Sequence, residues 1–378
     1  MTKKAEFTFI GAGPSNLILI VNVLGRGIDP KQITVIGDQK GGAFANELSA
    51  GSSVPGNTKT KEYKKLYEDL YKLVPSILPP KAMKFDLDAE QDETTCSLNV
   101  AAGPLRYIAE KISNIVNYIE GRAIKIKKTD KGYHIAFKRL NGSSESIYTH
   151  QAILGIGGEP RVGKLPSQYK DIQILNPHDT FIDSVVREKF SSRKLILANI
   201  GSSHSAALAT MHFIKAGHSV VQFMNKEYLY AETIINPNGS KMIKHDDTGL
   251  KGEVARWTKE FLKDLSGGNS PYHTSYKRYI GKDKNEIETL LKKHLNGCTH
   301  AVFTIGYNPA QTLKVEGFVL SRENHNSKTM QFHNMKGLWG NGLAFAEMVN
   351  NAQSNGLAKY HLTAAKLAPR LIAYASEN

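Results

Sequence analysis

The apolar positions near the N-terminus predict a strand, a turn and a helix in immediate succession. Residues 6–10 form a short apolar run, and residues 17–24 form an apolar segment that is closed by Gly25 and Gly27. A β-branched run at 33–36 predicts a second strand. Strand, turn, helix and strand in this order make the βαβ unit that opens a dinucleotide-binding sheet.

The same succession occurs a second time, almost two hundred residues later. Residues 194–200 predict a strand, 205–216 a helix that ends at Gly217, and 219–224 the following strand. Two βαβ units with glycine-containing turns predict an α/β protein with two Rossmann-like dinucleotide-binding domains.

The remaining pattern is less regular. A glycine- and serine-rich stretch at 41–60 predicts a loop, residues 79–98 read as irregular, and 231–285 is polar and mixed. Further helices are expected at 63–74, 103–118, 252–264, 284–294 and 344–371, and further strands at 123–128, 133–138, 146–148, 152–156 and 301–305.

Composition narrows the class of protein. A length of 378 residues favours two domains, and Lys+Arg exceed Asp+Glu by 49 − 35 = 14 charges. These charges are scattered and no nucleic-acid-binding motif accompanies them, so we expect anionic dinucleotides as partners and no nucleic acid. We expect a cytoplasmic protein, because no apolar run is long enough for a membrane span and the first strand leaves no room for a signal peptide.

Two further compositional features limit the chemistry. Cys96 and Cys298 are far apart and form no Cys-x-x-Cys, which removes the redox-active disulfide of many flavin reductases. The thirteen histidines show no metal-ligand spacing, so no metal is expected.

The first turn has the residues that a pyrophosphate requires. Gly11 permits the tight turn, Gly13 lets the backbone approach the phosphates, and Pro14 suits the first turn of the helix. Helix N–H groups then point at the phosphates, with Ser15 beside them. Asn16 stands in place of the third glycine of the usual fingerprint, and the alternative is a plain tight turn.

An acidic residue normally follows the second strand and binds a ribose. Gly37 occupies the usual position here, and Asp38 comes next, so Asp38 is the candidate.

The second turn is a weaker match. Gly201 begins it, but Ser203 replaces the second glycine and would crowd a pyrophosphate. His204 and Ser205 follow. Ser205 could cap the helix or donate a hydrogen bond to phosphate. Lys226 is the nearest cation for a 2′-phosphate, although an ordinary exposed lysine is the alternative. A retained fold that no longer binds nucleotide is the alternative for the whole turn.

Several segments, in chain order, resemble the N-hydroxylating monooxygenases of ornithine and lysine and the flavin-containing monooxygenases. They are the turns at 11–17 and 201–206, the crossovers at 152–160 and 301–309, and the segment at 335–342. The resemblance implies a discontinuous FAD domain (1–162 and 299–378) and an inserted NAD(P)H domain (163–298). It also implies flavin contacts from Gly42, Phe44, Asn57, Asn341 and Gly342, with a helix beginning at 341–345 near the flavin.

The chain departs from those families in three places. His178 lies where a histidine is often found, but the preceding Phe-x-Gly is absent. Asn341 stands where related flavoproteins frequently have aspartate, and the chain is short for an amino-acid hydroxylase.

The resemblance implies an FAD-dependent oxidoreductase. In the family, NADPH reduces FAD, and oxygen then gives a C4a-(hydro)peroxyflavin that oxygenates a nucleophilic nitrogen or sulfur of a small substrate. NADH in place of NADPH stays open. Two alternatives also remain: an NAD(P)H-dependent flavin reductase or dehydrogenase without oxygenation, and an FAD-binding protein without activity whose NADPH site has decayed.

Overall fold

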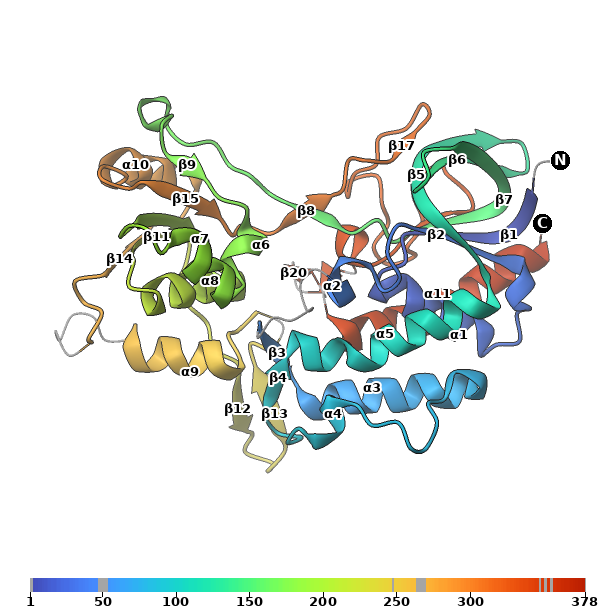
Figure 1. Ribbon diagram of the computed structural model, residues 1–378, viewed down its shortest axis with the longest axis horizontal. Helices are drawn as coiled ribbons and strands as arrows, with labels where there is room; N and C mark the ends of the chain where they lie inside the picture. The colour runs from blue at the N-terminus through green and yellow to red at the C-terminus, as the bar shows by residue number, and fades with distance from the viewer. Residues whose placement is uncertain are drawn as a thin grey trace.

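The computed structural model describes residues 3–46, 54–246, 248–262, 270–346, 348–349, 352–353 and 356–377. It consists of two α/β domains, each built on its own parallel sheet, that lie side by side along the longest axis of the molecule (Figure 1). The predicted fold class, two Rossmann-like domains with the second inserted into the first, is confirmed.

The first domain has a five-stranded parallel sheet. In spatial order its strands are β5 (Asn117–Thr129), β2 (Ile33–Gly37), β1 (Lys3–Ile10), β7 (Ser144–Leu154) and β18 (Leu338–Gly340). All five residues of β2 are buried, because both faces of this sheet are covered.

Helices cover one face of this sheet and an antiparallel extension covers the other. The helices are α1 (Pro14–Leu24), α3 (Thr60–Leu73), α5 (Leu98–Ile115) and α11 (Leu357–Glu377), and they pack on Phe7 and Phe9. On the other face, β6 (Gly132–Arg139) pairs antiparallel with the far ends of β5 and β7, and β17 (Lys314–Val315) pairs with β5. This sandwich fixes the carboxyl ends of β1, β2 and β7 along one edge, where the first turn lies.

The second domain repeats the scheme on a smaller scale. Its parallel strands, in spatial order, are β14 (Tyr276–Ile280), β11 (Ser219–Met224), β10 (Ile196–Ile200), β15 (His300–Phe303) and β9 (Gln173–Ile174). Its helices are α6 (Pro177–Thr180), α7 (Asp183–Phe190), α8 (His204–Lys215), α9 (Gly252–Phe261) and α10 (Lys284–His294). Strand β15 pairs with β10, so the second sheet extends to Phe303, past the boundary expected at 298/299.

Short elements connect the domains and border the space between them. The two crossovers pair as β8 (Gly158–Pro160) and β16 (Tyr307–Pro309), and β3 (Pro55–Lys59) pairs with β4 (Thr95–Ser97). The other short elements are α2 (Gly42–Asn46), α4 (Asp86–Ala89), β12 (Glu232–Ile235), β13 (Lys241–Lys244), β19 (Met348–Val349), β20 (Ala352–Gln353), and the 3-10 turns η1 (Pro30–Gln32), η2 (Pro75–Ile77), η3 (Ser167–Tyr169) and η4 (Leu343–Phe345).

Several expected elements differ from those observed. The stretch at 41–60 contains α2 and β3 as well as loop, and its residues 47–53 lie outside the described residues. The helix expected from 103 begins at Leu98, because Ser97 accepts a hydrogen bond from the N–H of Val100 and caps it. Of the helix expected at 252–264, α9 covers Gly252–Phe261, and residues 263–264 lie outside the described residues.

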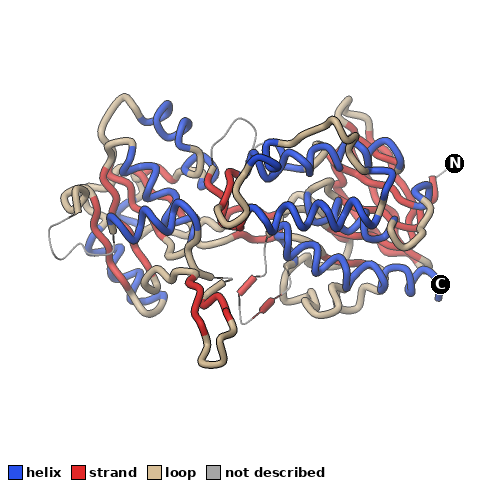
Figure 2. The backbone as a smooth tube through the Cα atoms, turned by 90° about the horizontal axis from the view of Figure 1, so that it is seen from below, coloured by secondary structure: helices blue, strands red, loops and turns tan. Residues whose placement is uncertain are grey.

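Strands β3 and β4 of the first domain contact the second domain directly. Val54 packs in the apolar core of the second domain, and a Cβ on Gly252 would lie 2.3 Å from Oγ1 of Thr95. Figure 2 shows the helices of both domains and the β12–β13 hairpin that projects away from the body. The contact brings the start of α9 against the first domain.

Candidate functional site

The turn after β1 lies against the turn after β7. Gly11 has φ +92°, and a Cβ on it would lie 2.3 Å from the carbonyl oxygen of Gly155. Gly42, with φ +62°, approaches Gly13 in the same way, since its Cβ would lie 2.8 Å from the Gly13 Cα. A Cβ on Gly13 itself would meet no protein atom within 4 Å. Gly11 and Gly42 are therefore required by protein packing, whereas Gly13 faces open space.

The side-chain amides of two buried asparagines hold this turn in place by hydrogen bonds. Asn16 donates to the carbonyl oxygens of Ile10 (3.1 Å) and Gly11 (2.8 Å). Asn341 donates to the carbonyl of Ser15 (3.0 Å) and to Oδ1 of Asn16 (3.3 Å), and accepts from the N–H of Gly342 (2.8 Å). Both side chains are buried and neither lines the cavity described below. These two side chains therefore hold the turn in position, and a cofactor contact from either residue stays a prediction.

The packing at the end of β2 explains why the acidic residue stands at position 38 and not at position 37. A Cβ on Gly37 would lie 2.6 Å from the Cβ of Ala12, so a side chain has no room there. Asp38 is the first residue that can carry one, and Nη2 of Arg122 on β5 holds its carboxylate at 2.5 Å. Sequence reasoning missed Arg122, because only the pairing of β2 with β5 brings it beside Asp38.

A cavity of about 510 Å³ begins at this turn and runs to the crossovers, a size typical of cofactor sites. Its lining includes nine residues of the first domain, which are expected cofactor contacts and one residue between them: Gly11, Ala12, Gly13, Pro14, Ser15, Asp38, Gly42, Phe44 and Asn57. Gly342 is not among the lining residues; its φ of +75° lets it approach Ser15, whose Oγ would lie 2.2 Å from a Cβ at this position. We name this space the turn cavity.

The far end of the turn cavity is formed by the crossovers and the second domain. Gly157 and Gly158 line it, together with Tyr307 of β16 and His178 of α6. The Tyr307 hydroxyl lies 3.3 Å from Nε2 of His178, and burial raises the pKa of Tyr307 to about 12. The phenol is therefore neutral at physiological pH and can donate a hydrogen bond into the cavity or to the imidazole.

A second helix besides α1 begins at this cavity, and it is not the one expected at 341–345. Residues 343–345 form the 3-10 turn η4, so no α-helix starts at 341–345. Helix α11 begins at Leu357, and Gly356, Leu357 and Tyr360 line the turn cavity. Its free N–H groups and positive dipole end thus favour negative charge there, as do those of α1. The same shift corrects the helix expected at 344–371.

The buried imidazole of His325 is expected to make the stability of the protein depend on pH. Its ring lies 5.1 Å from that of Phe332 and 5.2 Å from that of Phe345, and burial lowers its pKa to about 4. A lowered folded-state pKa means that stability is full above the unfolded pKa of about 6.5 and is lost as pH falls towards 4. Urea titrations of His325→Gln should show about 2 kcal/mol less loss between pH 8 and pH 5 than wild type. Equal losses in both proteins would contradict this assignment.

The second turn is also held from behind by a buried polar network. A Cβ on Gly201 would lie 2.2 Å from Oγ1 of Thr304, so the return segment requires glycine here. Gln222 donates to the carbonyl of Gly201 (3.0 Å) and accepts from Thr210 and Tyr276 (both 3.0 Å). The two turns are therefore built alike, each with a side-chain amide fixing its first residues.

The other expected nucleotide contacts are arranged less favourably. Ser203 is exposed and Ser205 half-buried at the start of α8, and Lys226 is exposed. His204 faces the first domain: burial lowers its pKa to about 4, and a hydrogen bond with the backbone of Pro55 opposes that shift. None of these four residues, nor Gly201, lines either of the two cavities described for this molecule.

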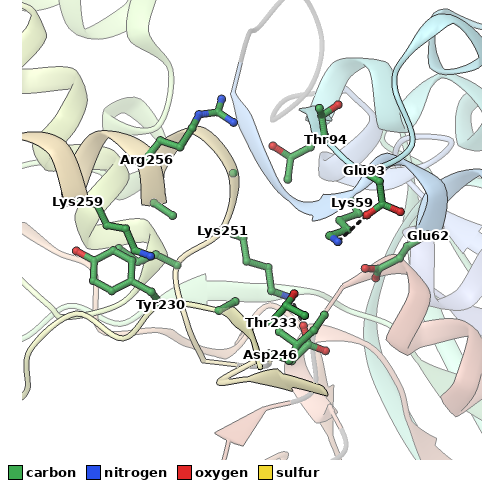
Figure 3. A pocket seen from close by; sticks show the side chains of 16 residues that line it. Lys59, Glu62, Glu93, Thr94, Tyr230, Thr233, Asp246, Lys251, Arg256 and Lys259 are labelled. Atoms are coloured by element: carbon green, nitrogen blue, oxygen red, sulfur yellow. Dashed lines mark hydrogen bonds and ion pairs between the residues drawn. The ribbon is translucent and has the colours of Figure 1, made fainter. Parts of the chain in front are cut away.

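A second cavity of about 290 Å³ lies between the domains (Figure 3). The first domain contributes Lys59, Glu62, Glu93, Thr94 and Thr95 to its wall. The opposite wall comes from the hairpin and α9 with residues Tyr230, Ala231, Thr233, Ile243, Asp246, Leu250, Lys251, Gly252, Ala255, Arg256 and Lys259. We name it the interdomain cavity.

The charges of the interdomain cavity are mostly paired within each wall. Glu93 binds Lys59 (2.8 Å) and Lys61 (2.5 Å), and these hydrogen bonds lower its pKa to about 2. Lys251 binds Asp246 at 2.5 Å. Within the described part of the chain, Glu62 on one wall and Arg256 on the other have no ion-pair partner. The cavity thus presents one unpaired charge of each sign.

The two cavities are neighbours. Asn57 lines the turn cavity and Lys59 the interdomain cavity, and these residues are two positions apart on β3. Tyr63 and Glu62, adjacent on α3, also line one cavity each. A small molecule in the interdomain cavity would therefore lie beside the wall of the turn cavity.

Thiols do not contribute to either cavity. Cys96 and Cys298 are both buried, and burial raises the pKa of each, that of Cys298 to about 11. Among the described residues, no three histidine, cysteine or acidic side chains gather as metal ligands would. The described helices include none with the length and apolar character needed to cross a bilayer.

Comparison with solved structures finds the same architecture across the whole chain. Bacillithiol disulfide reductase from Bacillus cereus is 16% identical with a TM-score of 0.61, and each chain is covered completely. Ornithine N-hydroxylase from Kutzneria sp. 744, solved with reduced FAD, NADP⁺ and L-ornithine, is 11% identical with a TM-score of 0.59 (98% and 99% covered). Thioredoxin reductase from Lactococcus lactis is 10% identical with a TM-score of 0.55 (99% and 100% covered).

No protein-family model and no curated protein sequence matches the chain. The structural likeness at these identities establishes the fold. The chain shares the fold of these structures, with two α/β domains of which the second is inserted into the first.

Proposed function

We propose that the protein is an FAD-dependent oxidoreductase that takes electrons from NAD(P)H. The turn cavity carries this proposal, because one continuous space connects the Gly11–Gly13 turn, the Asp38 carboxylate and the crossover at Gly157–Gly158. Its residues fit the cofactor: Gly13 opens towards pyrophosphate, Asp38 can accept hydrogen bonds from ribose hydroxyls, and the α11 N-terminus favours negative charge. When bound, FAD supplies the electron transfer that no side chain of this cavity could supply.

For NAD(P)H we propose the second turn, with Gly201, Ser203, His204 and Ser205 at the pyrophosphate and Lys226 as the cation for a 2′-phosphate. The carboxyl ends of parallel strands are where α/β sheets bind such ligands, and the end of β10 leads into this turn. The exposure of Ser203 and Lys226 leaves both accessible to a nucleotide.

One spectroscopic experiment tests the redox proposal. The purified protein should bind FAD, and anaerobic addition of NADPH should bleach the visible absorbance of the bound flavin. NADH, in a parallel titration, distinguishes the two nucleotides. Tight FAD binding without reduction by either nucleotide would contradict the proposal and favour the alternative without activity.

The finer proposal is oxygenation of a small nucleophilic amine. In the net reaction, NAD(P)H, a proton, O₂ and the substrate would give NAD(P)⁺, water and a substrate that carries the second oxygen atom. Both thiols are buried with raised pKa values, which argues against a relay through the protein's own cysteines. Peroxide formed in full stoichiometry with every amine offered would favour a reductase or oxidase instead.

We propose the interdomain cavity as the substrate site. Glu62 offers an unpaired carboxylate for an ammonium group, and Arg256 offers a guanidinium for a carboxylate on the opposite wall. L-Ornithine, the ligand of the Kutzneria enzyme, is the first probe to use.

Glu62→Gln should raise KM for a stimulating amine such as L-ornithine by about tenfold or more, because one charge-assisted hydrogen bond is lost. Reduction of the flavin by NADPH, in the absence of amine, should be unchanged. Glu68→Gln is the matched control, since Glu68 is on the same helix, is paired with Lys72 and lies outside both cavities. Equal KM values in the two variants would remove Glu62 from the site.

A further inference from the structure

The hairpin of β12 and β13 exposes more apolar surface than a solvated turn requires. It projects from the second domain in both views (Figures 1 and 2). All eight strand residues are exposed, and four of them are large apolar side chains: Ile234, Ile235, Met242 and Ile243. Ile235 is 69% and Met242 47% exposed. A cluster of this kind on a projecting element marks an interaction surface.

The strand register places apolar groups on both faces of the hairpin. Ile234 is opposite Met242, and Thr233 is opposite Ile243. Thr233 and Ile243 line the interdomain cavity, so Ile234 and Met242 face the other way. Among the described strands only β13 pairs with β12, which leaves one edge of β12 without a neighbouring strand. Two-stranded hairpins are marginally stable in water, and such an edge is a template for a further strand.

The charged residues of the hairpin determine which of its strands can pair with the same strand of a second chain. Strand β13 carries Lys241 and Lys244, so pairing of β13 with a second β13 would bring four lysines into one ladder. The charged residue of β12 is Glu232, and Lys259 already neutralises it at 2.6 Å. A strand from a second copy can thus pair with β12 without repulsion between like charges.

We propose that two copies of the chain dimerise by antiparallel pairing of β12 with β12, about a twofold axis that passes beside Ile234. A twofold axis perpendicular to the sheet places one residue opposite itself. With Ile234 in that position, Thr233 lies opposite Ile235 of the partner subunit, and the two Met242 side chains flank the central isoleucines. With Thr233 in that position, Ile234 would lie opposite Glu232, an apolar residue against a charge. The Ile234-centred register therefore pairs the two Ile234 side chains with each other and places no charged residue opposite an isoleucine.

Cysteine cross-linking tests this register in the full-length holoprotein. Residues directly opposite in antiparallel strands have Cα atoms about 4.5–5.5 Å apart, within the range that a disulfide spans. Ile234→Cys should form a covalent dimer under mild oxidation. Thr233→Cys and Ile235→Cys should remain monomeric on non-reducing gels when alone and cross-link when mixed. Leu140→Cys, 64% exposed on the first domain, is the control that should not cross-link.

Light scattering of the wild-type holoprotein should give twice the 41.7 kDa chain mass. Ile234→Lys should give a monomer with unchanged FAD content and melting temperature, because it opposes two lysines at the axis, while Leu140→Lys should stay dimeric. A monomeric wild type would overturn the proposal. A dimer that survives Ile234→Lys, or an Ile234→Cys protein that never cross-links, would overturn it equally.

Discussion

Gly11→Ala is expected to abolish FAD binding and to destabilise the first domain by about 3 kcal/mol or more. The alanine Cβ would lie 2.3 Å from the carbonyl oxygen and 2.9 Å from the carbonyl carbon of Gly155. Both atoms are backbone, and β1 and β7 are paired up to Ile10 and Leu154, so neither turn can move away without breaking the sheet. The positive φ of Gly11 adds strain of its own.

Gly27→Ala separates the effect of a positive φ from the effect of the clash with the backbone of Gly155. Gly27 has φ +86°, close to that of Gly11, but a Cβ there would meet no atom within 4 Å. Urea titration should therefore show a loss of only about 1 kcal/mol, with full FAD content measured from the visible absorbance. If the two variants were equally stable and equally yellow, close packing of the two turns would not be what requires Gly11.

Gly13→Ala should behave in the opposite way. No protein atom opposes its Cβ, so the variant should fold as well as wild type. The methyl group would enter the turn cavity, and we expect FAD affinity to fall by at least about tenfold, the equivalent of about 1.4 kcal/mol. FAD titration of the apoprotein measures this, and unchanged affinity would place the pyrophosphate elsewhere.

Asn341→Asp is the second change with a large expected effect. The amide of Asn341 donates to the carbonyl of Ser15 and to Oδ1 of Asn16, and Asn16 is itself committed to Ile10 and Gly11. A carboxylate would place oxygen against two acceptors in a buried site. We expect the free energy of unfolding to fall by about 3 kcal/mol or more at pH 8, measured by urea titration.

The Asn341→Asp variant should recover at low pH. Its carboxylic acid, once protonated, could donate to the carbonyl of Ser15, and burial of the charged form raises the folded pKa above the unfolded value of about 3.9. A raised folded pKa gives stability that is lost as pH rises, so the deficit of Asn341→Asp relative to wild type should shrink from pH 8 to pH 5. A deficit that does not change with pH would contradict this account. Asn341→Ala, which cannot titrate, is the control.

The amino-acid sequence predicted the parts of the site that depend on short-range order. Gly11, Gly13, Pro14 and Ser15 line the turn cavity, and their arrangement follows from a strand, a tight turn and a helix that are adjacent in the chain. Asp38 was found for the same reason, although the contact between Gly37 and Ala12 that displaces it by one position needed the structure.

Contacts between distant segments were not predictable. Asn16 and Asn341 read as flavin contacts, yet they bond to each other across 325 positions of the chain. Arg122 beside Asp38, and Tyr307 beside His178, come together only when strands pair and the domains meet. The interdomain cavity belongs to this class, because its two walls come from different domains.

Periodicity and glycine position by themselves determined two βαβ units, their order and the turns that end their first strands, because those features depend on neighbouring residues. The tertiary structure decided which side chains line a cavity and which hold the turns by hydrogen bonds. It also moved the helix N-terminus at the cavity from 341–345 to Leu357. The physical reason is that burial and hydrogen-bond partners are set by segments far apart in the chain, and no local pattern of apolar and polar positions records them.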